Sequence, residues 1–131
     1  MYQLDTNIAI AISQDHPLAK PLFDARGEDC CISTIILAEL YLGAYCSQRV
    51  NKNLATIEEL IDLVDVADFD WDAAIEFAKI QAELRRIGKP TGILDAAIAA
   101  IARSRQDIIV TANVRDFENI PNCHIENWLN P

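Results

Sequence analysis

Short apolar runs alternate along the chain with longer segments of helical periodicity, and this alternation limits the possible folds more than any other feature. In the intervening segments apolar residues recur three and four positions apart, as on one face of a helix. The run DIIVTA at 107–112 is almost continuously apolar, as expected for a parallel strand covered on both faces. Strands that alternate with helices predict a three-layer α/β/α fold around a mostly parallel sheet. The expected strands lie within 1–5, 27–33, 63–69, 107–112 and, as a last edge strand, 123–128.

Local signals predict where the helices begin and end. A helix is expected to open at 15–17 and run toward Arg26, and 113–120 is expected to be a loop or a single helical turn. The remaining helices are expected within 6–13, 34–46, 49–61, 73–88 and 92–104. The expected cap residues are Thr6 or Asn7, Ser33, Asp70 or Asp72, and Gly88.

Length and composition predict one domain, residues 1–131, because 51% hydrophobic content in 131 residues is enough for one core. There is no apolar leader and no apolar run approaching ~18 residues, so neither export nor membrane insertion is expected, and the expected compartment is the cytoplasm. The cysteines at 30, 31, 46 and 123 have no chelating spacing and are expected to be reduced, mostly buried thiols. His16 and His124 are expected to be surface or loop residues.

The charge balance is acidic, with eleven basic and twenty acidic residues and a formal net charge of −9. Such a chain does not bind nucleic acid through its bulk charge. A polyanionic substrate would have to be held by a bound divalent cation or by a small basic patch such as Arg85, Arg86 and Lys89.

Four acidic residues stand where a solvated carboxylate is not expected. Asp5 and Asp116 directly follow apolar strands, and in open α/β sheets ligands bind outside the carboxyl ends of the strands. Glu39 and Asp95 fall on largely apolar faces of their helices. Each acid also has a plain explanation, as a helix cap, a boundary residue or a first-turn acid. Other acids, such as Glu58, Glu59, Glu76 and Glu83, are expected on solvated helix faces.

Convergence of the four acids in one cleft explains them together. Clustered carboxylates repel each other unless they are protonated or bridged by a cation, and Mg²⁺ or Mn²⁺ prefers such hard oxygen ligands. A metal of this kind lowers the pKa of an attacking water and neutralises charge on a phosphate. The pattern therefore predicts metal-dependent hydrolysis of phosphodiester bonds.

The order and spacing of several motifs resemble the PIN-domain family, and more narrowly the VapC toxins of type II toxin–antitoxin pairs. The resemblance covers essentially the whole chain. Its motifs are LDTN at 4–7, S-x-x-x-x-AEL-x-x-G at 33–43, TGILDAAIAAIA at 91–102, IVTANVRDFENI at 109–120 and IENW at 125–128.

The resemblance implies a metal-dependent endoribonuclease with Mg²⁺, or Mn²⁺, as cofactor. It implies Asp5, Glu39 and Asp95 as principal acids, and it leaves open whether Asp116 or Asn113 approaches the metal, because many relatives have aspartate at position 113. The implied supporting polar residues are Thr6, Thr111 and Asn113. The candidates for contact with the RNA backbone are Arg85, Arg86, Lys89, Arg103, Arg105 and Arg115.

The same resemblance implies a homodimer, no membrane partner, and a small VapB-like antitoxin that inserts a segment with a basic residue into the acidic cleft. One alternative is a degenerate PIN domain that serves only as a protein-binding module. The loss of a principal acid would favour this alternative, but all three principal acids are present. A phosphoacceptor signalling domain would need clustered acids after the first strand and a lysine after the last strand. LDTN carries one acid, and no lysine follows Lys89.

Overall fold

Five parallel strands form one sheet in the order β3-β2-β1-β4-β5. The structure is a computed structural model and describes residues 1–130. Tyr2 of the central strand pairs with Cys30 on one side and with Ile108 on the other. All strands run in the same direction, which confirms the expected parallel sheet, and the last strand lies at an edge as predicted. The strands are β1 (Tyr2–Leu4), β2 (Cys30–Ser33), β3 (Asp65–Ala67), β4 (Ile108–Val110) and β5 (His124–Glu126).

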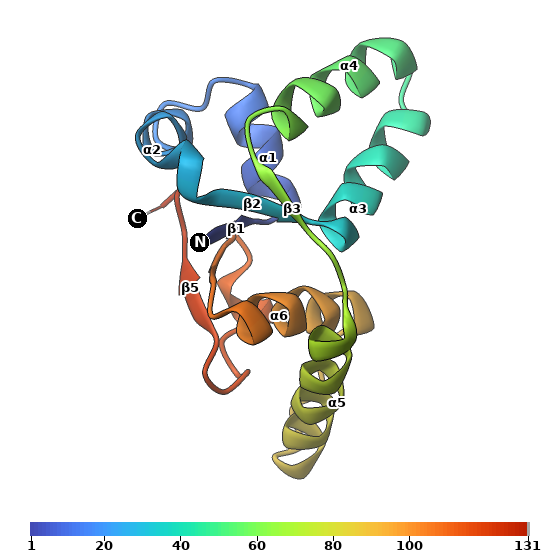
Figure 1. Cartoon of the computed structure of the whole chain (residues 1–131), viewed down its shortest axis with the longest axis vertical. Coiled ribbons are helices and arrows are strands. Elements are labelled where there is room, and N and C mark those ends of the chain that lie inside the picture. The colour runs from blue at the N-terminus through green and yellow to red at the C-terminus, as the bar shows by residue number, and fades with distance from the viewer. Residues whose placement is uncertain (131) are drawn as a thin grey trace.

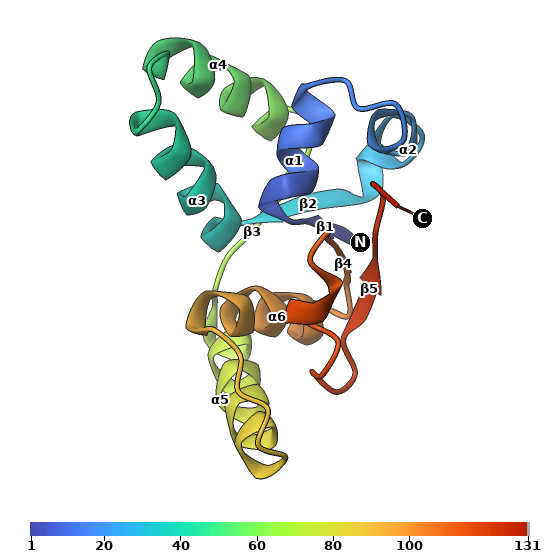
Figure 2. The ribbon, with the colours of Figure 1, turned by 180° about the vertical axis from the view of Figure 1, so that it is seen from behind.

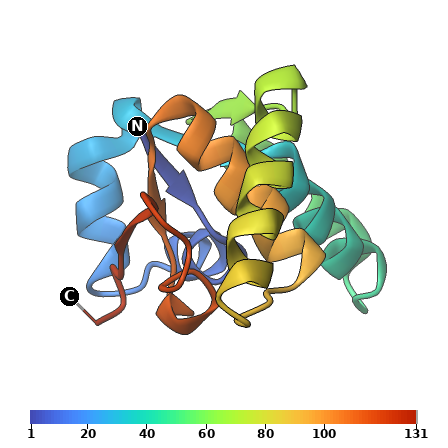
Figure 3. The same ribbon diagram turned by 90° about the horizontal axis from the view of Figure 1, so that it is seen from below.

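The helices cover both faces of this sheet, so the predicted three-layer α/β/α architecture is confirmed (Figures 1 and 2). The group on one face comprises α1 (Thr6–Ser13), α2 (Ala19–Arg26), α3 (Thr34–Tyr45) and α4 (Val50–Ile61). The pair on the other face is α5 (Trp71–Arg86) and α6 (Ile93–Arg105). Figure 3, seen from below, shows α5 and α6 side by side. Among residues 1–130 no helix is both long and apolar enough to cross a membrane.

Helix α6 lies against the sheet because its sequence carries only small or branched apolar residues over two turns. Every residue from 96 to 102 is buried. The alanines let α6 approach its neighbours closely, and Ile98 and Ile101 fill the space between them. Full burial of one isoleucine stabilises the fold by about 1.5–3 kcal/mol. The first turn of this rigid helix carries Asp95, so the core fixes where that carboxylate begins.

The predicted caps of α3 and α5 are confirmed. The Ser33 hydroxyl accepts a hydrogen bond from the Ile36 N–H at 3.2 Å, and the Asp70 carboxylate accepts one from the Ala73 N–H at 2.9 Å. Gly88 has φ +65° just beyond α5, a left-handed conformation that L side chains rarely adopt and that ends the helix.

Two helix starts differ from the prediction. The cap of α1 is neither Thr6 nor Asn7 but Asp5, as in the plain explanation of that acid. Strand β1 ends at Leu4 and leaves Asp5 extended, where its Oδ1 accepts from the Thr6 N–H at 2.9 Å. Helix α2 begins at Ala19, later than the expected 15–17. The ring Nδ1 of His16, expected as a plain surface or loop residue, accepts from the N–H groups of residues 18 and 19 at 3.1 and 3.3 Å.

Two short 3-10 turns complete the fold, η1 (Gly27–Asp29) and η2 (Val114–Asp116). The second is the single helical turn expected within 113–120, and it carries Asp116 to the carboxyl edge of the sheet.

Candidate functional site

The strand order reverses at β1, which has β2 on one side and β4 on the other. At such a switch point the connections leave in opposite directions, and a crevice opens outside the carboxyl ends of the two strands. Asp5 follows β1 directly, and its N–H donates to the Val110 carbonyl of β4 at 2.9 Å. The fold therefore places Asp5 at the point in the sheet where a ligand site is expected.

Two hydrogen bonds orient the Asp5 carboxylate, which is 8% exposed. Oδ1 accepts from the Thr6 N–H, and Oδ2 accepts from the Thr111 hydroxyl at 2.7 Å. Thr111 is completely buried, and its own oxygen accepts from the Asn113 N–H at 3.0 Å. Each carboxylate oxygen has a further lone pair, so Asp5 keeps acceptor capacity toward the crevice.

Glu39 reaches the same place from α3. Its Oε2 accepts a short hydrogen bond from the Thr6 hydroxyl, and its side chain is only partly exposed. Thr6 thus bonds to both acids, through its N–H to Asp5 and through its hydroxyl to Glu39. This pair of bonds explains why a glutamate lies on an otherwise apolar helical face.

Asp95 completes the group from the first turn of α6. No donor within residues 1–130 reaches its carboxylate, and its pKa is raised from 3.8 to about 6. Burial is the largest cause, followed by the negative charges of Asp116, Asp5 and Glu39. The four acids predicted from the sequence are therefore close enough to act on one another electrostatically.

The arrangement is an open group of acids. Within residues 1–130 no three histidine, cysteine or acidic side chains stand close enough together to enclose a metal ion by themselves. Mg²⁺ commonly binds through one or two carboxylates and keeps several waters, so open carboxylates with unused lone pairs fit its coordination. The half-buried Asp95 carboxylate, without a donor and repelled by three others, is the feature that a cation would stabilise most.

The six basic residues considered for RNA contact fall into three groups. Arg85 and Arg86 are exposed on the last turn of α5. Lys89 and Arg115 are exposed beside a hollow of about 210 Å³ that Asp95 and Asp116 also line. Arg103 and Arg105 form ion pairs inside the fold.

Arg103 holds α5 against α6. Its guanidinium donates to Glu76 at 2.6 Å, to Glu83 at 2.9 Å and to the Pro121 carbonyl at 3.1 Å, and its side chain is 10% exposed. The expectation that Glu76 and Glu83 are simply solvated was wrong, because both pair with this arginine. The guanidinium is already satisfied, so its geometry favours a structural role over RNA contact.

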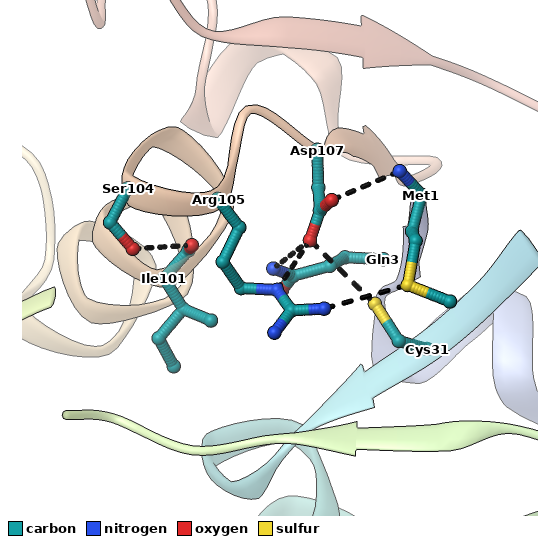
Figure 4. Close-up of polar contacts among 7 residues, drawn as sticks. All are labelled: Met1, Gln3, Cys31, Ile101, Ser104, Arg105 and Asp107. Atoms are coloured by element: carbon teal, nitrogen blue, oxygen red, sulfur yellow. Dashed lines mark hydrogen bonds and ion pairs between the residues drawn. The ribbon is translucent and has the colours of Figure 1, made fainter.

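Arg105, whose side chain is 38% exposed, pairs with the buried carboxylate of Asp107 at the opposite, amino-terminal edge of the sheet (Figure 4). Its Nε donates to Asp107 Oδ2 at 2.7 Å, and the same carboxylate accepts from Gln3 at 3.1 Å and from the Met1 amino group at 3.0 Å. Asp107 was not singled out in the sequence, because its position before an apolar strand resembles that of any turn residue. Its burial and partners assign it to the fold rather than to the crevice.

A groove of about 350 Å³ runs between α1, α3 and α4. Thr6 and the acid Glu39 form part of its wall. Ile10, Leu40 and Ile57 give it apolar walls. A side chain added at Gly43 would meet no atom within 4 Å, so this part of α3 is open. The groove is thus an apolar channel that leads to the acidic crevice.

All four cysteines are free, and Cys30 and Cys31 are buried as expected, whereas Cys46 is exposed. Burial raises the pKa of Cys30 to about 11 and that of Cys31 to about 12, so both remain protonated thiols at neutral pH. None of them contributes to the acidic crevice through a recorded contact.

Comparison with known proteins gives consistent matches over nearly the full length. A family model described as "PIN domain" matches residues 2–122. The "tRNA(fMet)-specific endonuclease VapC" of Shigella flexneri is 42% identical over 128 residues, 97% of each chain. The "Ribonuclease VapC2" of Haemophilus influenzae is 39% identical over 129 residues, 98% of each chain. Among solved structures, DNA-bound VapBC from Salmonella typhimurium superposes with a TM-score of 0.91 at 41% identity, covering 97% of each chain.

Proposed function

The chain belongs to the PIN-domain family, and we propose that it is a VapC-type endoribonuclease, the toxin of a type II toxin–antitoxin pair. The membership confirms the resemblance drawn from the motifs. The observation that supports the proposed chemistry is the geometry at the switch point of the sheet, where Thr6 bonds to both Asp5 and Glu39 and where Asp95 and Asp116 line one hollow. The raised pKa of Asp95 agrees with this geometry, because a solvated surface acid would not be influenced by three other carboxylates in this way.

The proposed site uses Asp5, Glu39 and Asp95 as ligands of Mg²⁺, or of Mn²⁺, with Asp116 as the fourth acid. Asp116 lines the same hollow as Asp95, whereas Asn113 does not, and this position favours Asp116 as the fourth acid. When bound, the cation would lower the pKa of an attacking water and neutralise charge on the phosphate.

The supporting residues position these acids. Thr111 holds one oxygen of Asp5, and Thr6 holds the other oxygen together with Glu39. Because the carboxylates do not enclose an ion by themselves, retained waters would complete the coordination of the cation. Hydrolysis forms a bond from water oxygen to phosphorus, breaks the bond from phosphorus to a ribose oxygen, and transfers a proton to that leaving oxygen.

We propose a transfer RNA as substrate, and initiator tRNA as the first to test. The support is similarity alone: two relatives named tRNA(fMet)-specific endonuclease are 42% and 41% identical across 97% of this chain. The acidic chain would need its bound cation and local basic side chains to hold such a polyanion.

The decisive experiment compares cleavage of initiator tRNA and elongator methionine tRNA by the purified protein, in Mg²⁺ and in EDTA. We expect faster cleavage of initiator tRNA, only with metal, and none by the Glu39→Gln variant. Mg²⁺ at about 100 times its Kd should also stabilise the fold by about 2.7 kcal/mol, seen as a higher melting temperature. Absence of both cleavage and the thermal shift would favour the alternative, a PIN domain that only binds a protein partner.

We propose that the antitoxin binds in the groove between α1, α3 and α4. An apolar segment fits its walls, and a basic side chain at the end of that segment would meet Glu39 and Asp5 with opposite charge. The predicted homodimer stays a prediction; exposed Leu42 and Tyr45 of α3 supply apolar surface for it.

Filling the groove should weaken antitoxin binding while leaving the nuclease intact. We expect Gly43→Leu, which projects a side chain into open groove space, to raise the Kd for the cognate antitoxin and to leave tRNA cleavage unchanged. Gly43→Ala is the matched control, since it adds helix propensity but little bulk. Calorimetric titration of each variant with the antitoxin measures the two Kd values. Equal Kd values for the two variants would place the antitoxin elsewhere.

A further inference from the structure

We propose that the hollow beside Asp95 and Asp116 is a subsite for one nucleotide of single-stranded RNA next to the scissile phosphate. This inference rests on the proposed nuclease function and names the part of the protein that would hold the substrate. The hollow lies between the loop 87–92, which joins α5 to α6, and the turn η2. Its wall includes two of the four acids, so a ligand in it would lie next to the reacting phosphate.

The two walls of this hollow are tied together. The Thr91 hydroxyl, from the loop before α6, donates to the Asp116 backbone carbonyl at 3.2 Å. Below this contact the floor is formed by Leu84 and Ile120, which are 1% and 4% exposed and belong to the core. This hydrogen bond links the two walls, and the core residues beneath them anchor the hollow to the fold.

Lys89 and Arg115 stand at its edge and are free to bind an anion. Both side chains are exposed, and neither forms an ion pair with any residue from 1 to 130. Arg103 and Arg105, in contrast, are already neutralised by Glu76, Glu83 and Asp107. On a chain with net charge −9, unpaired cations beside the acids suit a phosphodiester, which needs positive charge for positioning.

The remaining lining suits a nucleobase. At about 210 Å³ the hollow is smaller than the roughly 300–1,000 Å³ of sites for drug-sized ligands, so it suits a single nucleotide unit. Its lining is mainly polar, and the exposed Asn119 amide beside it can both donate to and accept from a base edge. Single-stranded RNA is recognised in part through such hydrogen bonds to base edges.

Binding of a defined RNA tests the subsite without relying on turnover. The probe is a fluorescein-labelled, single-stranded RNA of about twelve nucleotides and mixed sequence, titrated in Mg²⁺ at several salt concentrations. All proteins carry Glu39→Gln to prevent cleavage, since Glu39 does not line the hollow. We expect Lys89→Ala and Arg115→Ala each to weaken binding several-fold and to reduce the salt slope by about 0.7, the value of one lost phosphate contact with a single strand.

Arg86→Ala is the matched control, because it removes the same charge from an exposed position that does not line the hollow. It should leave the salt slope unchanged. In proteins with Glu39 restored, Asn119→Ala should alter the relative kcat/KM among RNAs that differ only in the base next to the cleaved bond. A subsite is supported only if these changes exceed those of the control.

The outcomes separate the two proposals. If cleavage requires metal and Asp95 but Lys89→Ala and Arg115→Ala behave like Arg86→Ala, the subsite is wrong and the nuclease stands. If the unmodified chain neither binds the RNA probe nor cleaves tRNA in Mg²⁺, both proposals fail.

Discussion

Replacing Asp95 with asparagine is expected to abolish metal-dependent RNA cleavage and, in the absence of metal, to raise the melting temperature. The activity is expected to fall because Asp95 is a charged ligand of the cation in the proposed site. Loss of an outer contact to a metal site already costs about 10–100-fold, so more than about 100-fold is expected here. Stability rises because Asp95 is half-buried, has no hydrogen-bond donor and is repelled by Asp116, Asp5 and Glu39. A gain in stability with a loss of function is the signature of a site strained for its ligand.

The pH dependence of this gain follows from the raised pKa of Asp95. Its folded-state pKa of about 6 lies above the ordinary value of 3.8, so the folded protein holds the proton more tightly than the unfolded chain. The stability contributed by the protonated group is complete below 3.8 and is lost as the pH rises through about 6. In EDTA, parent and Asp95→Asn should therefore melt alike near pH 4, and the variant should melt higher at pH 7.

Asp72→Asn provides the matched control for this experiment. Asp72 is also a first-turn acid, on α5, but it is exposed and is not one of the four acids of the crevice. Its loss should cost about 0.3–1 kcal/mol through the helix dipole and leave cleavage intact. If Asp95→Asn instead lowers the melting temperature at pH 7 as Asp72→Asn does, Asp95 is a structural first-turn acid.

The fold was predictable because local sequence and sheet geometry agree. Apolar runs such as 107–112 specify buried parallel strands, and Ser33 and Asp70 cap helices through bonds to residues three positions away. The sequence offered Asp5, Thr6 and Asn7 as possible caps of α1 and did not decide among them, because the boundary between β1 and α1 is a single residue. Because only Asp5 separates β1 from α1, its carboxylate lies at the crevice.

The acids could be predicted because each violates a local rule, a charge on an apolar face or directly after a strand. Their orientation could not, because it depends on contacts between distant segments, such as Thr111 to Asp5 and Thr6 to Glu39. Basic residues carry no such violation. On sequence alone Arg103 and Arg115 are equivalent surface charges, and only the packing of α5 against α6 distinguishes a satisfied guanidinium from a free one.

Replacing Asp107 with alanine is expected to lower the free energy of unfolding by about 3 kcal/mol. The Asp107 side chain is 3% exposed and accepts hydrogen bonds from Arg105 and Gln3 (Figure 4). Gln3 is 2% exposed and its Oε1 already has no partner, so the variant would leave the whole amide buried without a hydrogen bond. Because a domain is stable by only about 5–15 kcal/mol, chemical denaturation will detect this loss readily.

The pH dependence of the Asp107 effect has the opposite sign to that of Asp95. Burial raises the pKa of Asp107, but hydrogen bonds from Arg105, the Met1 amino group and Gln3 outweigh it, so the folded-state pKa lies below 3.8. The stability is present above 3.8 and is lost as the pH falls through the folded-state pKa, where parent and variant should converge. Asp107→Asn keeps an acceptor for Gln3 and should lose less. Cleavage per folded molecule should be unchanged, because Asp107 precedes β4, at the edge of the sheet opposite the crevice. A variant as stable as the parent at pH 7 would show that the contacts of Asp107 contribute nothing to stability.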